Sequence, residues 1–98
     1  MYVVTVEFVA RPGLADAFLR EMVANAAASR EREPGCRQFD VCASAEDGVV
    51  FLYEVYDDRA AFDAHLASPH FGAFSAATAD WVERKTVRTY ARVDPAGS

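Results

Sequence analysis

Apolar side chains occupy nearly every position of the first segment, from Tyr2 to Ala10. Valine is frequent there and Glu7 is the only charged residue, a composition that predicts a β-strand. Both alternating sets of side chains are apolar, so we expect both faces of the sheet that contains this strand to be covered.

From Leu14 to about Arg32 the apolar positions change to helical spacing, and helix-favouring residues predominate. This pattern predicts a long helix. Arg11-Pro12-Gly13 separates the helix from the strand, and Glu33-Pro34-Gly35 ends it, because proline and glycine interrupt regular structure.

Two more apolar segments follow, from Cys36 to Ser44 and from Val49 to Tyr56, and each is short enough to be a strand. The connection Ala45-Glu46-Asp47-Gly48 has the residue types of a tight turn. We therefore predict a β-hairpin. In its second strand, as in the first segment of the chain, both alternating sets of side chains are apolar.

The next region predicts a helix in two pieces. Either Asp57 or Asp58 is suited to cap a short helix that runs to Leu66. Ser68-Pro69 then provides a new N-cap followed by proline at the first helical position, which begins another helix extending to Trp81.

A last strand is predicted from Lys85 to Val93, and residues 94–98 form a tail, so residues 1–93 make a single domain. The order β-α-β-β-α-β predicts an α+β ferredoxin-like sandwich with an antiparallel sheet. Right-handed crossovers place the first and third strands in the centre and both helices on one face. A second subunit is the economical cover for the other face, which gives a homodimeric α/β barrel that encloses a pocket for a small organic molecule.

Composition excludes several partners. Hydrophobic residues make up 52% of the chain and charged residues 26%, as in an ordinary globular protein. The net charge of −5, with scattered basic residues, argues against nucleic acid. No apolar run approaches the ~20 residues that span a bilayer, and the N-terminus lacks a signal-peptide pattern, so we expect a cytoplasmic protein without a membrane partner. Cys36 and Cys42 share one predicted strand, too far apart to pair and without metal-ligand spacing, so we expect free thiols and no metal.

Asn25 is a polar residue on an apolar stripe. At about 100° per residue it falls within roughly 20° of Leu14 and Phe18, and Ser29 lies on the same stripe. A buried amide costs a few kcal/mol unless it is hydrogen-bonded. Asn25 is therefore expected either to bond to a backbone carbonyl or buried water, or to face a ligand.

The two histidines present the same choice. His65 follows Ala61 and Phe62 at helical spacing, so it is either a satisfied core residue or a ligand-binding one. His70 lies in the first turn after the Ser68-Pro69 cap, where the helix N-terminus favours a neutral imidazole that can accept a proton. The alternative for His70 is an ordinary first-turn surface residue.

Two acids interrupt apolar strands that we predict to be neighbours, Glu7 and Glu54. Each is explained by a salt bridge or an interface hydrogen bond, or else by a desolvated carboxylate that serves as a general base. The aromatic residues of the last helix are core residues or the lining of a cavity: Phe71, Phe74 and Trp81.

Several stretches resemble one known family. They are Gly35 to Val41, Phe51 to Asp58, Ala61 to His65 and Ser68-Pro69-His70-Phe71, within a similarity that runs from the first strand to at least Trp81. Together they resemble the antibiotic biosynthesis monooxygenase family, most closely its small stand-alone members described as quinol monooxygenases and a related isomerase. The resemblance implies ferredoxin-like homodimers that use no metal, flavin or haem cofactor.

The resemblance also implies site residues and a reaction. A base, His65 or His70, deprotonates a small phenolic or quinol substrate, the anion passes an electron to O2, and Asn25 holds the developing oxyanion. The matching substrate-binding positions are Tyr53 and Glu54, and Asp40 and Trp81 match more loosely. Phe71 is added to the substrate-binding residues as an aromatic that could line the cavity. Alternative functions are an isomerase of a small carbonyl compound, phosphorylated or not, and a non-catalytic module that binds an aromatic metabolite.

Overall fold

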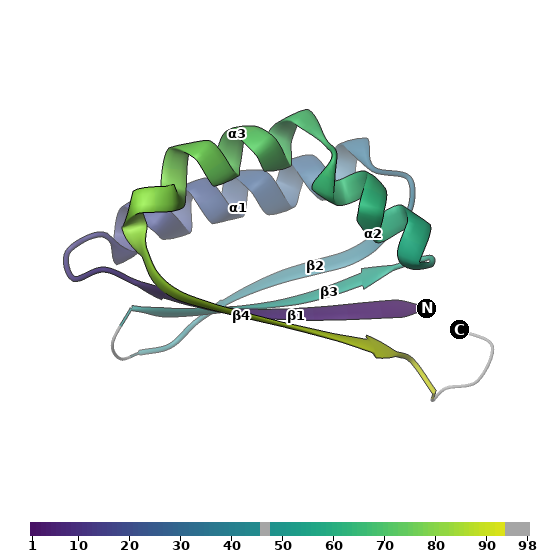
Figure 1. The fold of residues 1–98 in the computed structure, drawn as a ribbon, viewed down its shortest axis with the longest axis horizontal. Helices are drawn as coiled ribbons and strands as arrows, with labels where there is room; N and C mark the ends of the chain where they lie inside the picture. The colour runs from purple at the N-terminus through teal and green to yellow at the C-terminus, as the bar shows by residue number, and fades with distance from the viewer. Residues whose placement is uncertain (46–47, 94–98) are drawn as a thin grey trace.

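The computed structural model describes residues 1–45 and 48–93 and has two layers, a four-stranded sheet and a layer of helices on one of its faces (Figure 1). In chain order the elements are β1 (Tyr2–Ala10), α1 (Ala15–Arg32), β2 (Cys36–Ala43), β3 (Val49–Tyr56), α2 (Arg59–Leu66), α3 (Pro69–Thr78), the 3-10 turn η1 (Ala79–Trp81) and β4 (Val82–Ala91). The predicted α+β order, with its broken second helix, is confirmed.

The strand order is β2-β3-β1-β4, with every pair antiparallel, so β1 and β3 are central as the right-handed crossovers require. β4 begins at Val82 rather than at Lys85, because Val82 already pairs with Ala10 beyond a bulge at Glu83 of β4. The last helix correspondingly ends at Thr78 instead of reaching Trp81. The predicted turn residues 46–47 and the predicted tail 94–98 lie outside the described residues.

Two side-chain caps fix the helices that follow β3. Asp58, rather than Asp57, caps α2, because its Oδ1 accepts from the backbone N–H of Ala61 at 2.8 Å. Asp57 instead pairs with the guanidinium of Arg37 at 2.5 Å. Ser68 caps α3 through the N–H of Phe71 at 3.3 Å, with proline at the first helical position.

The core lies between the helices and the sheet. The apolar stripe of α1 packs onto the central strands, with Phe18 fully buried between Phe8 and Phe74 at ring-centroid distances of 4.9 and 5.7 Å. Val4 and Tyr56 are also fully buried beneath the helices. Burying such side chains contributes ~1.5–3 kcal/mol each, so this layer holds the helices at fixed positions over the sheet.

The outer face of the sheet carries a mixture of residues. Phe51 remains 39% exposed and Tyr90 49% exposed, while Val3 and Val55 are buried. Strand register separates the two acids: Glu7 pairs with Phe51 and lies exposed on the outer face, whereas Glu54 is buried under the helices.

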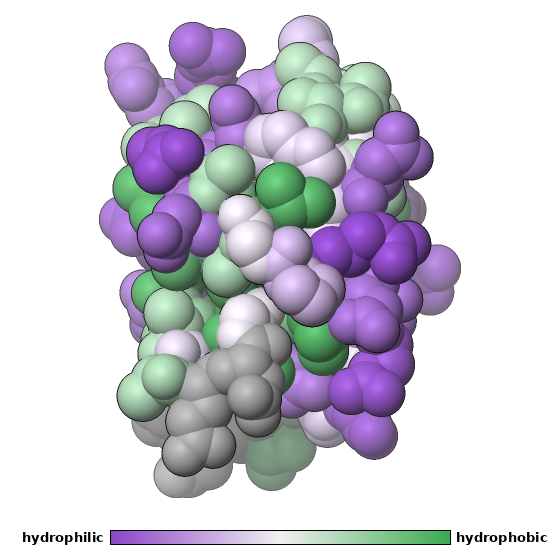
Figure 2. All heavy atoms as spheres, turned by 90° about the vertical axis from the view of Figure 1, so that its left-hand side faces the viewer, coloured by the Kyte–Doolittle hydropathy of each residue, from purple (hydrophilic) through white to green (hydrophobic). Residues whose placement is uncertain are grey.

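The end of the molecule drawn in Figure 2 shows hydrophobic residues as separate spots among hydrophilic ones. None of the described helices is long and apolar enough to cross a bilayer.

Candidate active site

A cavity of about 220 Å³ lies between the helices and the sheet within one chain. Apolar and aromatic side chains form most of its wall, and four residues add polar groups: Asn25, Glu54, His65 and Lys85. It therefore lies on the helix-covered face of the sheet, opposite the face where the sequence predicts a second subunit. A few convergent polar groups in an apolar cavity are typical of a small-molecule site.

Asn25 reaches this cavity from α1 with 5% of its surface exposed. In the described part of the chain, its Oδ1 is the only buried side-chain nitrogen or oxygen without a hydrogen-bond partner. Such an orphan costs about 1–3 kcal/mol. Neither a backbone N–H nor a side chain satisfies this oxygen, so the amide is suited to accept a hydrogen bond from a bound hydroxyl.

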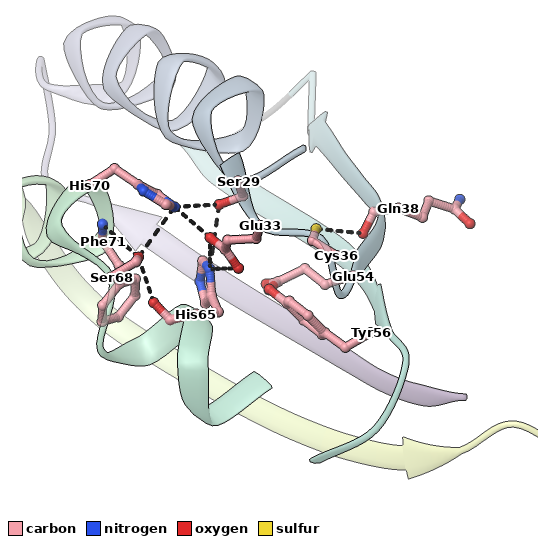
Figure 3. Close-up of polar contacts among 10 residues, drawn as sticks. All are labelled: Ser29, Glu33, Cys36, Gln38, Glu54, Tyr56, His65, Ser68, His70 and Phe71. Atoms are coloured by element: carbon pink, nitrogen blue, oxygen red, sulfur yellow. Dashed lines mark hydrogen bonds and ion pairs between the residues drawn. The ribbon is translucent and has the colours of Figure 1, made fainter. Parts of the chain in front are cut away.

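His65 is held by an acid that the sequence did not single out. Its Nδ1 lies 2.9 Å from Oε2 and 3.2 Å from Oε1 of Glu33, the residue that ends α1 (Figure 3). Because a carboxylate oxygen only accepts, we assign the imidazole proton to Nδ1, which donates a hydrogen bond to Glu33 and leaves the lone pair on Nε2. Burial lowers the pKa of His65 more than Glu33 raises it, so the imidazole stays neutral. The arrangement is that of a general base oriented by a carboxylate.

His70 contacts the same carboxylate from α3. Its Nε2 bonds to Oε2 of Glu33 and lies 3.2 Å from the hydroxyls of both Ser29 and Ser68. His70 does not line the cavity; it borders a shallow groove between α1 and α3. Figure 3 shows His65 and His70 converging on Glu33 from different helices. Glu33 therefore bridges His70, which borders the groove, and His65, whose side chain lines the cavity.

These three side chains are also the set that could hold a metal. In residues 1–45 and 48–93 they form a group whose ligand atoms all lie within 4.8 Å of one another, and two imidazoles with one carboxylate suit a zinc-like ion. In the structure the same atoms bond to each other. The sequence contains no spacing signature for this group, because its members come from the end of α1, from α2 and from the start of α3.

Glu54 enters the cavity from the sheet, and its carboxyl is almost wholly buried. The hydroxyl of Tyr56 donates to its Oε1 at 2.5 Å. Burial raises the pKa of Glu54 to about 7, although the Tyr56 bond and the charge of Lys85 oppose the shift. The Nζ of Lys85 lies 5.4 Å from the ring centroid of Phe8 and 5.9 Å from that of Phe71, where cation–π attraction holds it.

The structure brings only some of the expected site residues together. Asn25, Glu54, His65 and Phe71 line the cavity. Asp40 and Tyr53 are paired across β2 and β3 on the outer face, where Asp40 accepts from Nε2 of Gln38 at 2.6 Å. Trp81 packs against the core beside α3 and does not line the cavity.

Two residues at the site were not predicted from the sequence. Glu33 looked like part of a helix stop, and Lys85 like the first residue of an edge strand. The signal that could have found Glu33 is its spacing, because Ser29 and Glu33 continue the four-residue repeat that begins at Asn25.

The model of the antibiotic biosynthesis monooxygenase family matches residues 1–77 of this chain. A protein of Mycobacterium tuberculosis, Rv0793, is 33% identical over 86 residues, which cover 88% of this chain and 84% of that protein. Its name describes it provisionally as a monooxygenase.

Solved structures give the same result. The structure of Rv0793 superposes with a TM-score of 0.88 at 32% identity over 97% of both chains. A protein of Nitrosomonas europaea, described provisionally as an antibiotic biosynthesis monooxygenase, has a TM-score of 0.86 at 32% identity over 95% of this chain and 99% of its own. PA3566 of Pseudomonas aeruginosa has a TM-score of 0.86 at 29% identity over 94% of this chain and 93% of its own.

Proposed function

Since this chain belongs to the antibiotic biosynthesis monooxygenase family, we propose that it is a cofactor-independent monooxygenase that oxidises a small phenolic or quinol-type substrate with O2. The observation that carries the proposal is the Glu33–His65 pair at the wall of an apolar cavity. It provides a neutral base where a phenol would be held out of water.

The chemistry begins with proton transfer from the substrate hydroxyl to Nε2 of His65. Glu33 stabilises the imidazolium that forms, because its carboxylate already accepts the Nδ1 proton. The resulting phenolate is electron-rich and passes one electron to O2. Recombination of the two radicals forms a carbon–oxygen bond and a peroxide. For a phenol with an unsubstituted para carbon, the balance is that the phenol and O2 give a para-quinone and water.

The remaining wall residues suit this substrate class. Asn25 Oδ1 is an acceptor, so it binds a substrate hydroxyl that keeps its proton rather than the oxyanion that the resemblance implies for Asn25. The Phe71 and Phe74 side chains supply apolar contacts for a ring. A cavity of about 220 Å³ is smaller than the ~300–1,000 Å³ of typical drug-sized pockets. The substrate is therefore a small aromatic compound rather than an extended polycyclic one.

The test is oxygen uptake by chelator-treated protein supplied with a series of quinols, naphthols and anthrones. Uptake with formation of a quinone or ketone supports the proposal. Turnover of a carbonyl substrate without O2 would instead identify an isomerase. A ligand that binds in the cavity and is never converted would identify a binding protein.

Asn25→Leu provides a test of the hydroxyl contact. The substitution replaces an unsatisfied buried amide with an apolar group of similar size, so we expect an unchanged or higher melting temperature. The substrate KM should rise about 2- to 10-fold, because one neutral hydrogen bond is lost. A methyl ether of the substrate is the matched control, since it should bind equally to both proteins. Equal KM values for the free hydroxyl compound would contradict the assignment.

We also infer that the protein is a homodimer through the outer face of the sheet. Phe51 and Tyr90 border a hollow there together with Glu7 and Arg88. A second copy would find apolar side chains and one charge of each sign on this face. Phe51→Lys should lower the mass measured by sedimentation equilibrium toward that of a monomer, whereas wild type should sediment as a dimer. A monomeric wild type would refute the inference.

A further inference from the structure

The proposed oxidation needs a proton donor as well as a base. The substrate loses two protons during the reaction, and the distal oxygen gains two protons as it leaves as water. His65 explains the first removal, but a peroxide whose O–O bond breaks without a nearby acid must release hydroxide into an apolar cavity, which is costly. Among the described residues that line the cavity, Glu54 carries the carboxyl group.

We propose that protonated Glu54 is the acid that delivers a proton to the distal peroxide oxygen, so that the O–O bond breaks with release of water. The assignment rests on the proposed oxygenase function. The peroxide anion first takes the proton that His65 removed from the substrate, which gives a hydroperoxide and restores the neutral imidazole. His65 then removes the one hydrogen on the peroxide carbon, and the electron pair of that C–H bond forms the C=O bond. The O–O electrons leave with the distal oxygen, which takes the Glu54 proton and departs as water. The proton now on His65 returns to Glu54.

The geometry of Glu54 fits this role. It enters from β3 in the sheet, whereas His65 enters from α2 in the helix layer, so a flat substrate between the layers is within reach of both. The hydroxyl of Tyr56 donates to Oε1, which holds the carboxyl group in place at the cavity wall. The residue is 2% exposed, so its proton is shielded from bulk water.

The charged and titratable neighbours explain why Glu54 is an acid and His65 a base. Around Glu54 these groups are Tyr56 on β3, Cys36 on β2, Lys85 on β4, Glu33 at the end of α1 and His65 on α2. Burial dominates over them and raises the pKa of Glu54 to about 7, while burial lowers the pKa of His65. Near neutral pH the imidazole is therefore unprotonated and a substantial fraction of the carboxyl is protonated.

Tyr56 tunes this equilibrium. Its pKa is raised by burial, so its hydroxyl keeps the proton and donates a hydrogen bond to the carboxylate form of Glu54. That bond stabilises the ionised form and holds the pKa of Glu54 below the value that burial alone would give. Removing the hydroxyl is expected to make Glu54 hold its proton more strongly.

The experiment follows O2 uptake, oxidised product and total peroxide, including the substrate hydroperoxide, in the same reaction for wild type and Glu54→Gln. In wild type each O2 consumed should give one product molecule, and product formation should decline above about pH 7 as Glu54 ionises. Glu54→Gln should still take up O2, because His65 is intact, but product formation should fall about 100-fold and peroxide should accumulate.

Tyr56→Phe is the second variant, and it retains the acid. Its alkaline decline should move to higher pH, a shift that a merely structural role of Tyr56 would not produce. Wild-type product formation and no peroxide in Glu54→Gln would overturn the assignment and leave the oxygenase intact. If product formation in Tyr56→Phe declined at the same pH as in wild type, this would also contradict the assignment of Glu54. Wild type that consumes no O2 with any substrate would overturn both proposals.

Discussion

Replacing His65 with glutamine should reduce O2 uptake about 10²- to 10⁴-fold, the range that general base catalysis contributes. Glutamine keeps a polar side chain of similar length but has no basic nitrogen. The loss should appear in kcat more than in KM, because the base acts on the reacting proton rather than on substrate binding. Oxygen-electrode rates with the best substrate of the series provide the measurement. Circular dichroism should show that the variant folds.

The pH dependence identifies the base independently. His65 acts when neutral, so the rate should rise with pH through its pKa, and burial places this rise below the ordinary value of 6.5. Glu33→Gln removes the charge that raises the pKa of His65, so its acid limb should move to still lower pH. The assignment would be contradicted if His65→Gln took up O2 at the wild-type rate. It would also be contradicted if the acid limb of Glu33→Gln lay at a higher pH than that of wild type.

Gly35→Ala should destabilise the protein by about 1–3 kcal/mol, as overpacked cores generally do. A Cβ atom built at Gly35 lies 2.5 Å from the Cβ of Ala61, a contact that requires α2 to shift away from the start of β2. A domain of this size loses roughly 4–8 °C of melting temperature for each kcal/mol. Because α2 carries His65 and Gly35 closely follows Glu33, O2 uptake should fall as well.

Two controls separate this clash from other effects of alanine. Gly35→Ala combined with Ala61→Gly removes the clashing atom and should restore much of the melting temperature. Gly72→Ala places a methyl group where no atom lies within 4 Å, inside α3, and should be neutral or stabilising. Equal melting temperatures for wild type and Gly35→Ala would show that α2 does not rest against this glycine.

The fold followed from periodicity because each element has its own signal. Strand alternation, the proline and glycine interruptions and the Ser68-Pro69 cap placed every strand and helix of the described chain in the right order. The predicted ends of the elements differed from the structure where a tertiary contact decided them. β4 begins at Val82 because that residue pairs with Ala10, and Asp57 does not cap α2 because it pairs with Arg37. Neither contact has a local sequence signal.

The site was predictable where a polar residue interrupted an apolar stripe. Asn25 and His65 were found in this way, and both line the cavity. Asp40 and Tyr53 lie on the opposite face because side chains alternate along a strand, so a neighbour of a cavity residue points away from the cavity. The spacing of Glu33 from Asn25 and Ser29 indicates its helix face, but its pairing with the two histidines has no local signal because they are 32 and 37 residues away in the chain.

The placement of Glu33 at the end of α1 constrains how natural variants of this protein can differ in length. Asn25, Ser29 and Glu33 are separated by four residues each, and one inserted or deleted residue would rotate the following side chain by about 100°. Glu33 would then leave both histidines. We expect gene variants that keep the activity to tolerate gaps in the loop at residues 11–14 and to exclude them from residues 25–33.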